Sequence, residues 1–558
     1  MSKNLFNEPA SSESFGASFQ RQPRKKAKSK QVFKPYSQHQ VMLLPPSLEE
    51  FIPEQHLVRV VNRTIDGLNV NPLLATYKGS GTSAYSRLSA GLLKVLVYAY
   101  LSKIYSSRRI AKALREDVNF MWLSGMQRPD FRTINEFRSS RLKGVIDEVF
   151  GSMVLFLLDH DYIDLQQYFV DGTKLRADNN KHKIVWAKNT KRYKEKAQQK
   201  IKELLTKIQR VNDEENQRYG DNDLEELGEH STVTSDDVKE QVARLNETLQ
   251  SKTPPKSTVK PACSSRLRLA EAERTGRAVK KLETKLLPKL EKYEQQEQTL
   301  AGRNSYAKTD TDATAFRTKD GQLLPAYNLL IGTQRQFIVN YSFHQKRASE
   351  TDGLTHHMER LHQQLGCYPA LVMGDSAYGS EENYAFLAQR QIGNYLKYNT
   401  FHLEQKRSYR ADPYRKENFA FDAATDTYRC PQGRRLTFKQ VKQITTDNGY
   451  LTTARLYQCE SCHGCPVASQ CKRGKGDRTI QINPTLEAYR AQAWANLNSE
   501  DGIALRKQRG VDVEPPFGDI KFNQGYQRCR LRGQAKVNVE IGLLSIAHNT
   551  KKIASWVN

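Results

Sequence analysis

Three short motifs, far apart in the chain, place a carboxylate directly after an apolar run or at a helix start. Tyr168–Gly172 reads as a buried strand followed by Asp171, and Leu371–Asp375 repeats that order with a second acid. The prolines after Glu514 predict that this third acid lies in the first turn of a helix. A single Asp after a strand is usually a turn or capping residue, so the case rests on the three together.

Two Asp and one Glu supply the oxygen ligands that Mg²⁺ or Mn²⁺ prefers. Two such ions about 3.5 to 4 Å apart can stabilise both the attacking and the leaving oxygen of a phosphodiester. The chain has 87 Lys and Arg against 61 Asp and Glu, a net charge of +26, which favours a polyanionic partner. A positive net charge can also serve solubility alone or come from a basic tail. Here, however, the excess of Lys and Arg is spread over the whole chain. The expected partner is therefore a nucleic acid.

The order and spacing of these motifs are similar to those of the DDE transposases of insertion sequences, over most of the chain. The stretches that carry the resemblance are Val170–Lys174, Thr309–Ala313, Gly374–Gly379, Glu382–Tyr384, Val513–Lys521 and Leu531–Val537 with Asn549. The resemblance implies an RNase-H-like catalytic core behind an N-terminal helical domain. It also implies that Asp171, Asp375 and Glu514 are the catalytic, metal-binding triad.

A family signature, Tyr-x2-Arg-x3-Glu-x6-Lys, is kept only in its second half, where Lys521 follows Glu514 at the expected spacing. In the first half, Arg509 stands one place early. We expect Lys521 and Arg509 to contact DNA phosphate, with a solvated basic helix face as the alternative for both. Asp310 and Asp312 are rival metal ligands, although Thr309–Asp312 reads equally well as a turn.

The resemblance implies an enzyme, a transposase whose partner is double-stranded DNA. Such an enzyme cleaves phosphodiesters at the terminal inverted repeats of a mobile element and transfers the freed strand to target DNA. Holding two ends together predicts a homodimer or larger complex. Two alternatives stay open: an RNase-H-like nuclease that cuts without joining, and a transposase-derived DNA-binding protein that has lost catalysis.

The fold predicted is α/β, with a mixed sheet covered by helices, an all-α N-terminal domain and a coiled-coil-like helical insertion. Strands are predicted at Tyr168–Val170, Tyr327–Ile331, Phe337–Phe343, Ala370–Met373 and Asn394–Tyr398, and helices at Glu350–Leu365 and Glu381–Arg390. The predicted parts are a disordered basic tail (1–45), a helical DNA-binding-like domain (46–160), a catalytic core (161–186, 306–400 and 481–558), a helical insertion (187–305) and a Cys-containing insertion (401–480).

Two helical regions carry further expectations. In 46–160, the segments Ser106–Leu114 and Pro129–Arg138 suit a helix-turn-helix, although capped helix pairs occur in any α-domain. In 187–305, apolar residues at three- and four-residue steps predict three helical stretches. Polar stretches at 220–235 and 251–265 break them, and Pro288 should kink the last.

Eight cysteines are too few and too clustered for a secreted disulfide scaffold. Cys459, Cys462, Cys465 and Cys471 have spacing compatible with a structural Zn²⁺ site, and Cys430 lies upstream. Five thiols exceed what a tetrahedral site needs, so either one is spare or the cluster is reduced and unligated. Cys263, Cys367 and Cys529 read as ordinary thiols.

The chain offers no apolar run of the roughly 20 residues that span a bilayer. Its N-terminus is polar and lacks the pattern of a signal peptide. We therefore expect a cytoplasmic, nucleoid-associated protein without a membrane partner.

Overall fold

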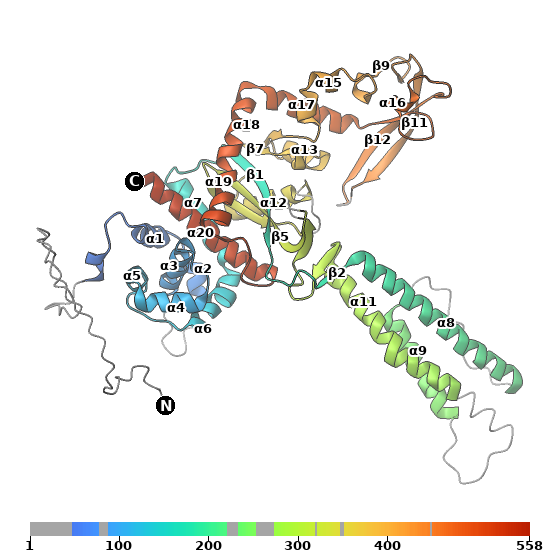
Figure 1. The fold of residues 1–558 in the computed structure, drawn as a ribbon, viewed down its shortest axis with the longest axis horizontal. Helices are drawn as coiled ribbons and strands as arrows, with labels where there is room; N and C mark the ends of the chain where they lie inside the picture. Colours follow the sequence, from blue (N-terminus) through green and yellow to red (C-terminus); the bar gives the residue numbers. More distant parts are fainter. Residues whose placement is uncertain are drawn as a thin grey trace, which may run out of the picture. The chain divides into compact units, whose positions relative to one another are not determined.

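The fold is known from a computed structural model, which describes residues 47–76, 88–219, 233–252, 273–317, 321–345, 351–446 and 449–557 (Figure 1). The predicted tail (1–45), Cys263 and most of the predicted breaks at 220–235 and 251–265 lie outside these residues.

A six-stranded mixed sheet forms the centre of the fold, in the order β4-β5-β1-β7-β8, with β6 also paired to β5. The strand β1 runs antiparallel to β5 and parallel to β7, which is parallel to β8. The strands are β1 (Gln167–Arg176), β4 (Thr314–Arg317), β5 (Leu323–Gln334), β6 (Phe337–Phe343), β7 (Leu371–Gly374) and β8 (Gly393–Leu396). The predicted α/β class with a mixed sheet is confirmed.

The strand β1 is longer than its apolar run predicts. It continues through Asp171 to Arg176, because the long antiparallel partner β5 provides backbone hydrogen bonds along the polar half as well. Hydrophobic periodicity alone marks only the half of the strand that is buried on both faces.

Helices cover the sheet. The helix α12 (Leu354–Leu365) contacts β6, α13 (Glu381–Gln389) contacts β8, and short helical turns η5 (Thr351–Gly353) and η6 (Ser376–Tyr378) precede them. The C-terminal segment adds α17 (Pro484–Asn498), α18 (Glu500–Asp512), α19 (Glu514–Gly518), the π-helical turn η8 (Asp519–Asn523) and α20 (Gln534–Val557). Of these, α17 packs on β8 and α18 on β7.

The N-terminal region is built from helices, as predicted. Its helices are η1 (Leu48–Phe51), α1 (Leu57–Asp66), α2 (Asn71–Ala75), α3 (Leu88–Leu101), α4 (Ser107–Glu116), α5 (Val118–Leu123), α6 (Phe131–Glu136), η2 (Phe137–Arg141), η3 (Leu142–Gly144) and α7 (Ile146–Asp159). The helix α5 separates the two segments predicted to form a helix-turn-helix, and both α5 and α6 contact α4.

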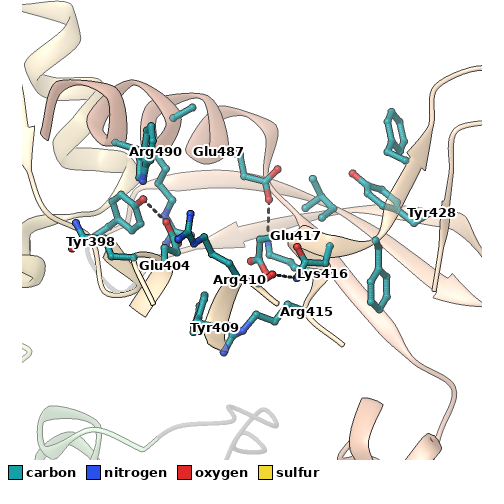
Figure 2. A pocket seen from close by; sticks show the side chains of 17 residues that line it. Tyr398, Glu404, Tyr409, Arg410, Arg415, Lys416, Glu417, Tyr428, Glu487 and Arg490 are labelled. Atoms are coloured by element: carbon teal, nitrogen blue, oxygen red, sulfur yellow. Dashed lines mark hydrogen bonds and ion pairs between the residues drawn. The ribbon is translucent and has the colours of Figure 1, made fainter. Parts of the chain in front are cut away.

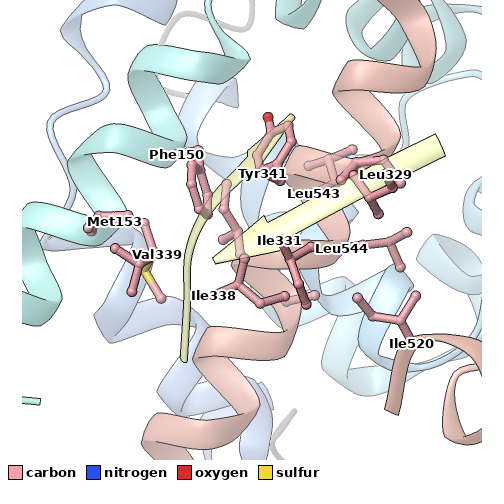
Figure 3. Close-up of a cluster of buried hydrophobic side chains, with 14 of the residues drawn as sticks. Phe150, Met153, Leu329, Ile331, Ile338, Val339, Tyr341, Ile520, Leu543 and Leu544 are labelled. Atoms are coloured by element: carbon pink, nitrogen blue, oxygen red, sulfur yellow. The ribbon is translucent and has the colours of Figure 1, made fainter. Parts of the chain in front are cut away.

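One apolar core joins this region to the sheet, because α20 packs on α1, α3, α7 and β6. Figure 3 shows part of this shared core. Phe150 of α7 lies beside Tyr341 of β6, and Leu543 and Leu544 of α20 lie close to β5. The rings of Phe150 and Tyr341 meet edge to face, with centroids 4.9 Å apart.

The helical insertion has a core of its own. It contains α8 (Ala187–Tyr219), α9 (Ser235–Lys252), helical residues 273–281, the π-helical turn η4 (Leu282–Leu286) and α11 (Leu287–Leu300). The apolar residues at helical spacing, among them Ile201, Val242 and Leu290, form a buried cluster separate from that of the sheet. The turn η4 lies directly before Pro288, where a kink was expected. At its base β2 (Ile184–Trp186) pairs with β3 (Ser305–Ala307).

The Cys-containing segment forms a second sheet, which was not predicted. Its five antiparallel strands follow the order β13-β12-β11-β10-β9. The elements are α14 (Phe401–Glu404), α15 (Arg407–Arg410), η7 (Lys416–Asn418), β9 (Ala420–Asp422), β10 (Thr427–Arg429), β11 (Arg435–Thr445), β12 (Leu451–Cys459), α16 (Ala468–Cys471) and β13 (Thr479–Ile482).

Within the described part of the chain, no helix is both long enough and apolar enough to cross a membrane.

The contact between Gly332 and Tyr168 gives a stability prediction. A Cβ at Gly332 would lie 1.7 Å from the hydroxyl oxygen of Tyr168, which is buried and 2.7 Å from His357 Nε2. We expect Gly332→Ala to lower the free energy of unfolding by about 1 to 3 kcal/mol in chemical denaturation, because the ring must move. Gly510→Ala in α18, with no neighbour within 4 Å, is the control and should be neutral or stabilising. Equal stabilities for the two variants would contradict the packing described.

Candidate active site

Asp171 and Asp375 lie side by side on neighbouring parallel strands. Phe169 of β1 is opposite Met373 of β7, and each aspartate follows two residues later. Side chains two residues apart point to the same face of a sheet, so the pairing register sets both carboxylates on one face at one level. The two motifs predicted to converge are brought together here. Asp375 also accepts a hydrogen bond from the amide of Ala377 (2.9 Å), which orients its carboxylate.

Lys397 stands at the same level on the next strand, and sequence reasoning missed it. It directly follows β8, where Gly374 is opposite Leu396, so Lys397 is next in register to Asp375. Burial lowers the pKa of Lys397, as do the positive charges of Arg509 and Arg506, while Asp375 opposes the shift. Its place inside the predicted strand Asn394–Tyr398 gave no sign of a role, because a lone Lys has no chemical meaning until its neighbour on the next strand is known.

Glu514 approaches Asp171 from the C-terminal helices. It is the first residue of α19, as the prolines predicted, and the buried Val513 holds the junction with α18. On α18, five residues before Glu514, Arg509 forms an ion pair with Asp171, with 3.1 Å between Nη2 and Oδ2. Both partners are mostly buried, with side-chain exposures of 13% for Arg509 and 20% for Asp171. Arg509 is therefore bound to the candidate triad, where a solvated face was the alternative.

The pKa of Asp171 shows how closely these charges interact. Burial raises this pKa, and the negative charges of Asp375 and Glu514 raise it further. The guanidinium of Arg509 and the amide of Gly172 act in the opposite direction without cancelling the rise. Asp171 is thus repelled by both other carboxylates in a partly dry site.

A hard divalent cation fits this donor set, because it would relieve the repulsion among three oxygen-bearing groups. Among the described residues, however, no group of three or more His, Cys, Asp or Glu side chains converges closely enough to hold a metal as it stands. The carboxylates are neighbours, and the side chains must turn toward a common point to share an ion.

Lys521 lies beside the acids. Its ammonium donates a hydrogen bond to the hydroxyl of Thr173, which is two residues after Asp171 and on the same face of β1. On α18, the Nε atoms of Arg506 and Arg509 are buried without a hydrogen-bond partner in the described structure. Several cationic groups thus surround the carboxylates, with donors available to an anion such as phosphate.

The rival acids Asp310 and Asp312 have structural partners. Asp310 is buried and accepts hydrogen bonds from the hydroxyl of Tyr327 (2.8 Å) and the amide of Gly533 (3.1 Å). Asp312 accepts from the amide of Gln534 at 2.7 Å. Together they anchor the turn that starts α20, which agrees with the alternative prediction that these two acids belong to a turn.

Two buried acids flanking Glu514 also serve the scaffold. Asp512 accepts a hydrogen bond from the Thr333 hydroxyl at 2.8 Å, and burial raises its pKa. Burial also acts to raise the pKa of Asp519, but hydrogen bonds and charge from His548 and Lys551 outweigh it and leave that pKa lowered. These contacts fix both ends of the segment that carries Glu514.

A cavity of about 860 Å³ opens on the far side of Tyr398, the residue after Lys397. Figure 2 shows Arg410, Arg415 and Lys416 on one side of it, with Arg490 of α17 opposite. Its lining also includes the exposed rings of Phe421 and Trp494 and the acids Glu404, Glu417 and Glu487. Cationic groups beside aromatic faces are typical of surfaces that bind nucleic acid strands.

A second cavity, of about 1010 Å³, lies between the N-terminal helices and the segment after η8. Arg108 at the start of α4 lies over the ring of Phe131 in α6 (5.1 Å), and Arg530 lines the opposite wall. The predicted helix pair therefore presents cationic groups to one hollow. A role in reading DNA sequence stays a prediction.

Comparisons with known families agree with the resemblance seen in the motifs. Residues 46–140 match the family model described as Transposase domain (DUF772), and residues 429–554 match that described as Transposase DDE domain. No curated protein and no solved structure matches the chain. The two matches confirm the resemblance to the DDE transposases of insertion sequences and support a transposase role. The DDE match includes Glu514 but neither Asp171 nor Asp375.

The raised pKa of Asp171 predicts a pH-dependent stability difference. The folded protein holds the Asp171 proton more tightly than the unfolded chain, so stability falls as the pH rises from the unfolded pKa of this carboxyl to its folded pKa. In EDTA, Asp171→Asn should therefore be more stable than the wild type at pH 8, because the amide carries no buried charge, and this gain should fade toward pH 4. Denaturant unfolding across this range measures the difference. A gain that grows toward low pH would mean that the ion pair with Arg509 dominates.

Proposed function

We propose that this transposase-domain chain cleaves phosphodiesters at the terminal repeats of an insertion sequence and transfers the strands to target DNA. The observation that carries the proposal is the in-register placement of Asp171 and Asp375, with Glu514 close enough to Asp171 for its charge to raise the pKa of that carboxyl. Residues 161–186, 306–400 and 481–558 would form the catalytic core and 46–160 the DNA-binding helical domain. The protein would act on DNA in the cytoplasm.

An RNase-H-like core is supported by the order of the strands. Three antiparallel strands, β6, β5 and β1, are followed by two parallel ones, β7 and β8. Asp375 lies at the carboxyl end of β7, Asp171 lies on β1 where its pairing with β7 has just ended, and Glu514 lies at the start of α19. In such sheets reactive groups gather outside the carboxyl ends of the strands.

Asp171, Asp375 and Glu514 would hold Mg²⁺ or Mn²⁺. When bound, the metal supplies positive charge to the phosphodiester oxygens on which negative charge develops. The three carboxylates in turn fix where the scissile phosphate can sit, because they are held by strand register and by a helix start.

Arg509 would change partners during substrate binding. Once Asp171 shares its charge with a cation, its attraction for Arg509 weakens, and the guanidinium becomes free to bind a backbone phosphate. Lys397, Arg506 and Lys521 would add charge around the same phosphate. The cationic and aromatic cavity beyond Tyr398 would take the strand that runs on from the site.

The decisive experiment incubates the protein with Mg²⁺ and a labelled duplex that carries the element's own end. Asp375→Ala and Glu514→Gln should lose cleavage and joining by roughly a thousandfold or more, because such groups act as one unit, while DNA binding persists. The matched control is Asp512→Asn, which alters a buried acid two residues from Glu514 but keeps a hydrogen-bond acceptor for Thr333.

Each outcome decides between functions. Cutting and joining by the wild type and the control alone supports the transposase. Cutting without joining favours a nuclease, and binding without either reaction in every variant favours a DNA-binding protein that has lost catalysis.

The helical insertion would hold two element ends together in a dimer. Trp186 pairs with Ser305, and the Ala187 amide donates to the Asn304 carbonyl at 2.9 Å, so residues 188–303 can be replaced by a short glycine turn. The insertion's separate core means that the sheet should stay folded. We expect the shortened protein to cut single ends but to lose paired-end complexes on native gels. Paired ends formed at the wild-type level would remove the insertion from this role.

A further inference from the structure

Five cysteines of the second sheet gather around one small cavity. Cys430, Cys459, Cys462, Cys465 and Cys471 all line a space of about 20 Å³. They come from the turn between β10 and β11, the end of β12, the loop that follows and α16. The cavity has room for one water-sized body, and all five thiols are free.

We propose that four of these cysteines, Cys430, Cys462, Cys465 and Cys471, bind one structural Zn²⁺, and that Cys459 does not. This differs from the set that spacing alone suggested, in which Cys459 stood in place of Cys430. Four thiolates in tetrahedral array are a preferred zinc environment, whereas Mg²⁺ takes oxygen ligands. The site is therefore chemically distinct from the carboxylate triad.

Cys459 belongs to the apolar core of the sheet. It is the last residue of β12 and its side chain is 3% exposed. It lies two residues after the buried Tyr457, so both side chains are on the inner face of the strand. Its partner across the ladder is Leu436, which is also fully buried. The other four cysteines are only partly buried, so their side chains have room to turn, and Cys430, Cys462 and Cys471 pack against the edge of this core.

The backbone around Cys462 resembles the surroundings of a metal-bound thiolate. The amide of Arg478 donates to Cys462 Sγ at 3.2 Å, a contact that stabilises negative charge on sulfur. The amide of Cys462 in turn donates to Asp477 at 2.7 Å. Between Cys462 and Cys465, Gly464 has a φ of +62°, so the chain reverses sharply and can present both sulfurs to one side.

A second tight turn presents Cys430. The amide of Gly433 donates a hydrogen bond to the Cys430 carbonyl at 2.8 Å, and the amide of Cys430 donates one to the Arg434 carbonyl at 2.9 Å. The sulfurs do not yet meet at bonding distance, since no group of three or more ligands is poised for a metal in the described residues. Rotation about the side-chain bonds of the four partly exposed cysteines would close the site around the ion.

The small core of this sheet explains why a metal would be needed. Six side chains form the buried cluster: Phe419, Leu436, Tyr457, Cys459, Ile480 and Ile482. Along β11, only Leu436 is buried. Units with so little apolar burial usually need a metal or disulfides for stability. Zinc would tie the β10–β11 turn to the loop after β12 and so hold the sheet closed.

The test measures metal in the full-length protein, purified under reducing conditions without added metal. Mass spectrometry of the metal content should find about one zinc per chain in the wild type and in Cys459→Ser. Cys430→Ser and Cys465→Ser should lose most of it. In the wild type, Co²⁺ exchanged for zinc should show the intense sulfur-to-cobalt absorption of four thiolates.

Stability gives a second readout that does not depend on activity. A strong chelator should lower the melting temperature of the wild type and of Cys459→Ser, and should change that of Cys430→Ser little. The proposal fails if the reduced wild type neither contains nor takes up zinc, or if Cys459→Ser loses the metal while Cys430→Ser keeps it. A disulfide among the five cysteines in the native protein would also overturn it.

Discussion

The pairing of three parallel strands is the constraint on which the candidate site depends. Hydrogen bonds between β1, β7 and β8 place Asp171, Asp375 and Lys397 in one row, two of them acids and one a base. Because side chains alternate along a strand, a slip of one residue would turn Asp375 to the other face of the sheet. The apolar residues before each acid are buried and oppose such a slip, so the core sets the geometry of the polar row.

Much of this arrangement could be predicted from the sequence, because its elements carry strong hydrophobic patterns. The predicted strand Phe337–Phe343 coincides with β6, and the helix predicted to end at Leu365 is α12. The apolar steps of the helical insertion became its separate core. These elements bury one face or both, and such burial gives a hydrophobic periodicity that can be recognised in the sequence of each segment alone. The role of the acids still rests on geometry and resemblance.

The parts that were missed have weak local signals. The strand β11 exposes most of its side chains, and β12 buries only Ala454, Tyr457 and Cys459, so neither strand shows the regular alternation of a half-buried sheet. Lys397 acquires its meaning from a strand partner, and Arg509 from its ion pair with Asp171. Likewise Cys430 is far from the other cysteines in sequence and joins them only through the β10–β11 turn. Long-range contacts of this kind cannot be read from a single stretch of chain.

The packing of α20 has a consequence for the order in which the protein can fold during synthesis. This helix covers α1, α3, α7 and β6 with residues such as Leu543 and Leu544, which are fully buried. Until residues 534–557 have left the ribosome, the surfaces that α20 covers have no partner, and direct contacts such as that of Phe150 with Tyr341 are left to join the N-terminal helices to the sheet. A nascent chain that already contains Asp171, Asp375 and Glu514 would thus lack a closed core. Reactive chemistry on DNA would be delayed until translation has passed α20.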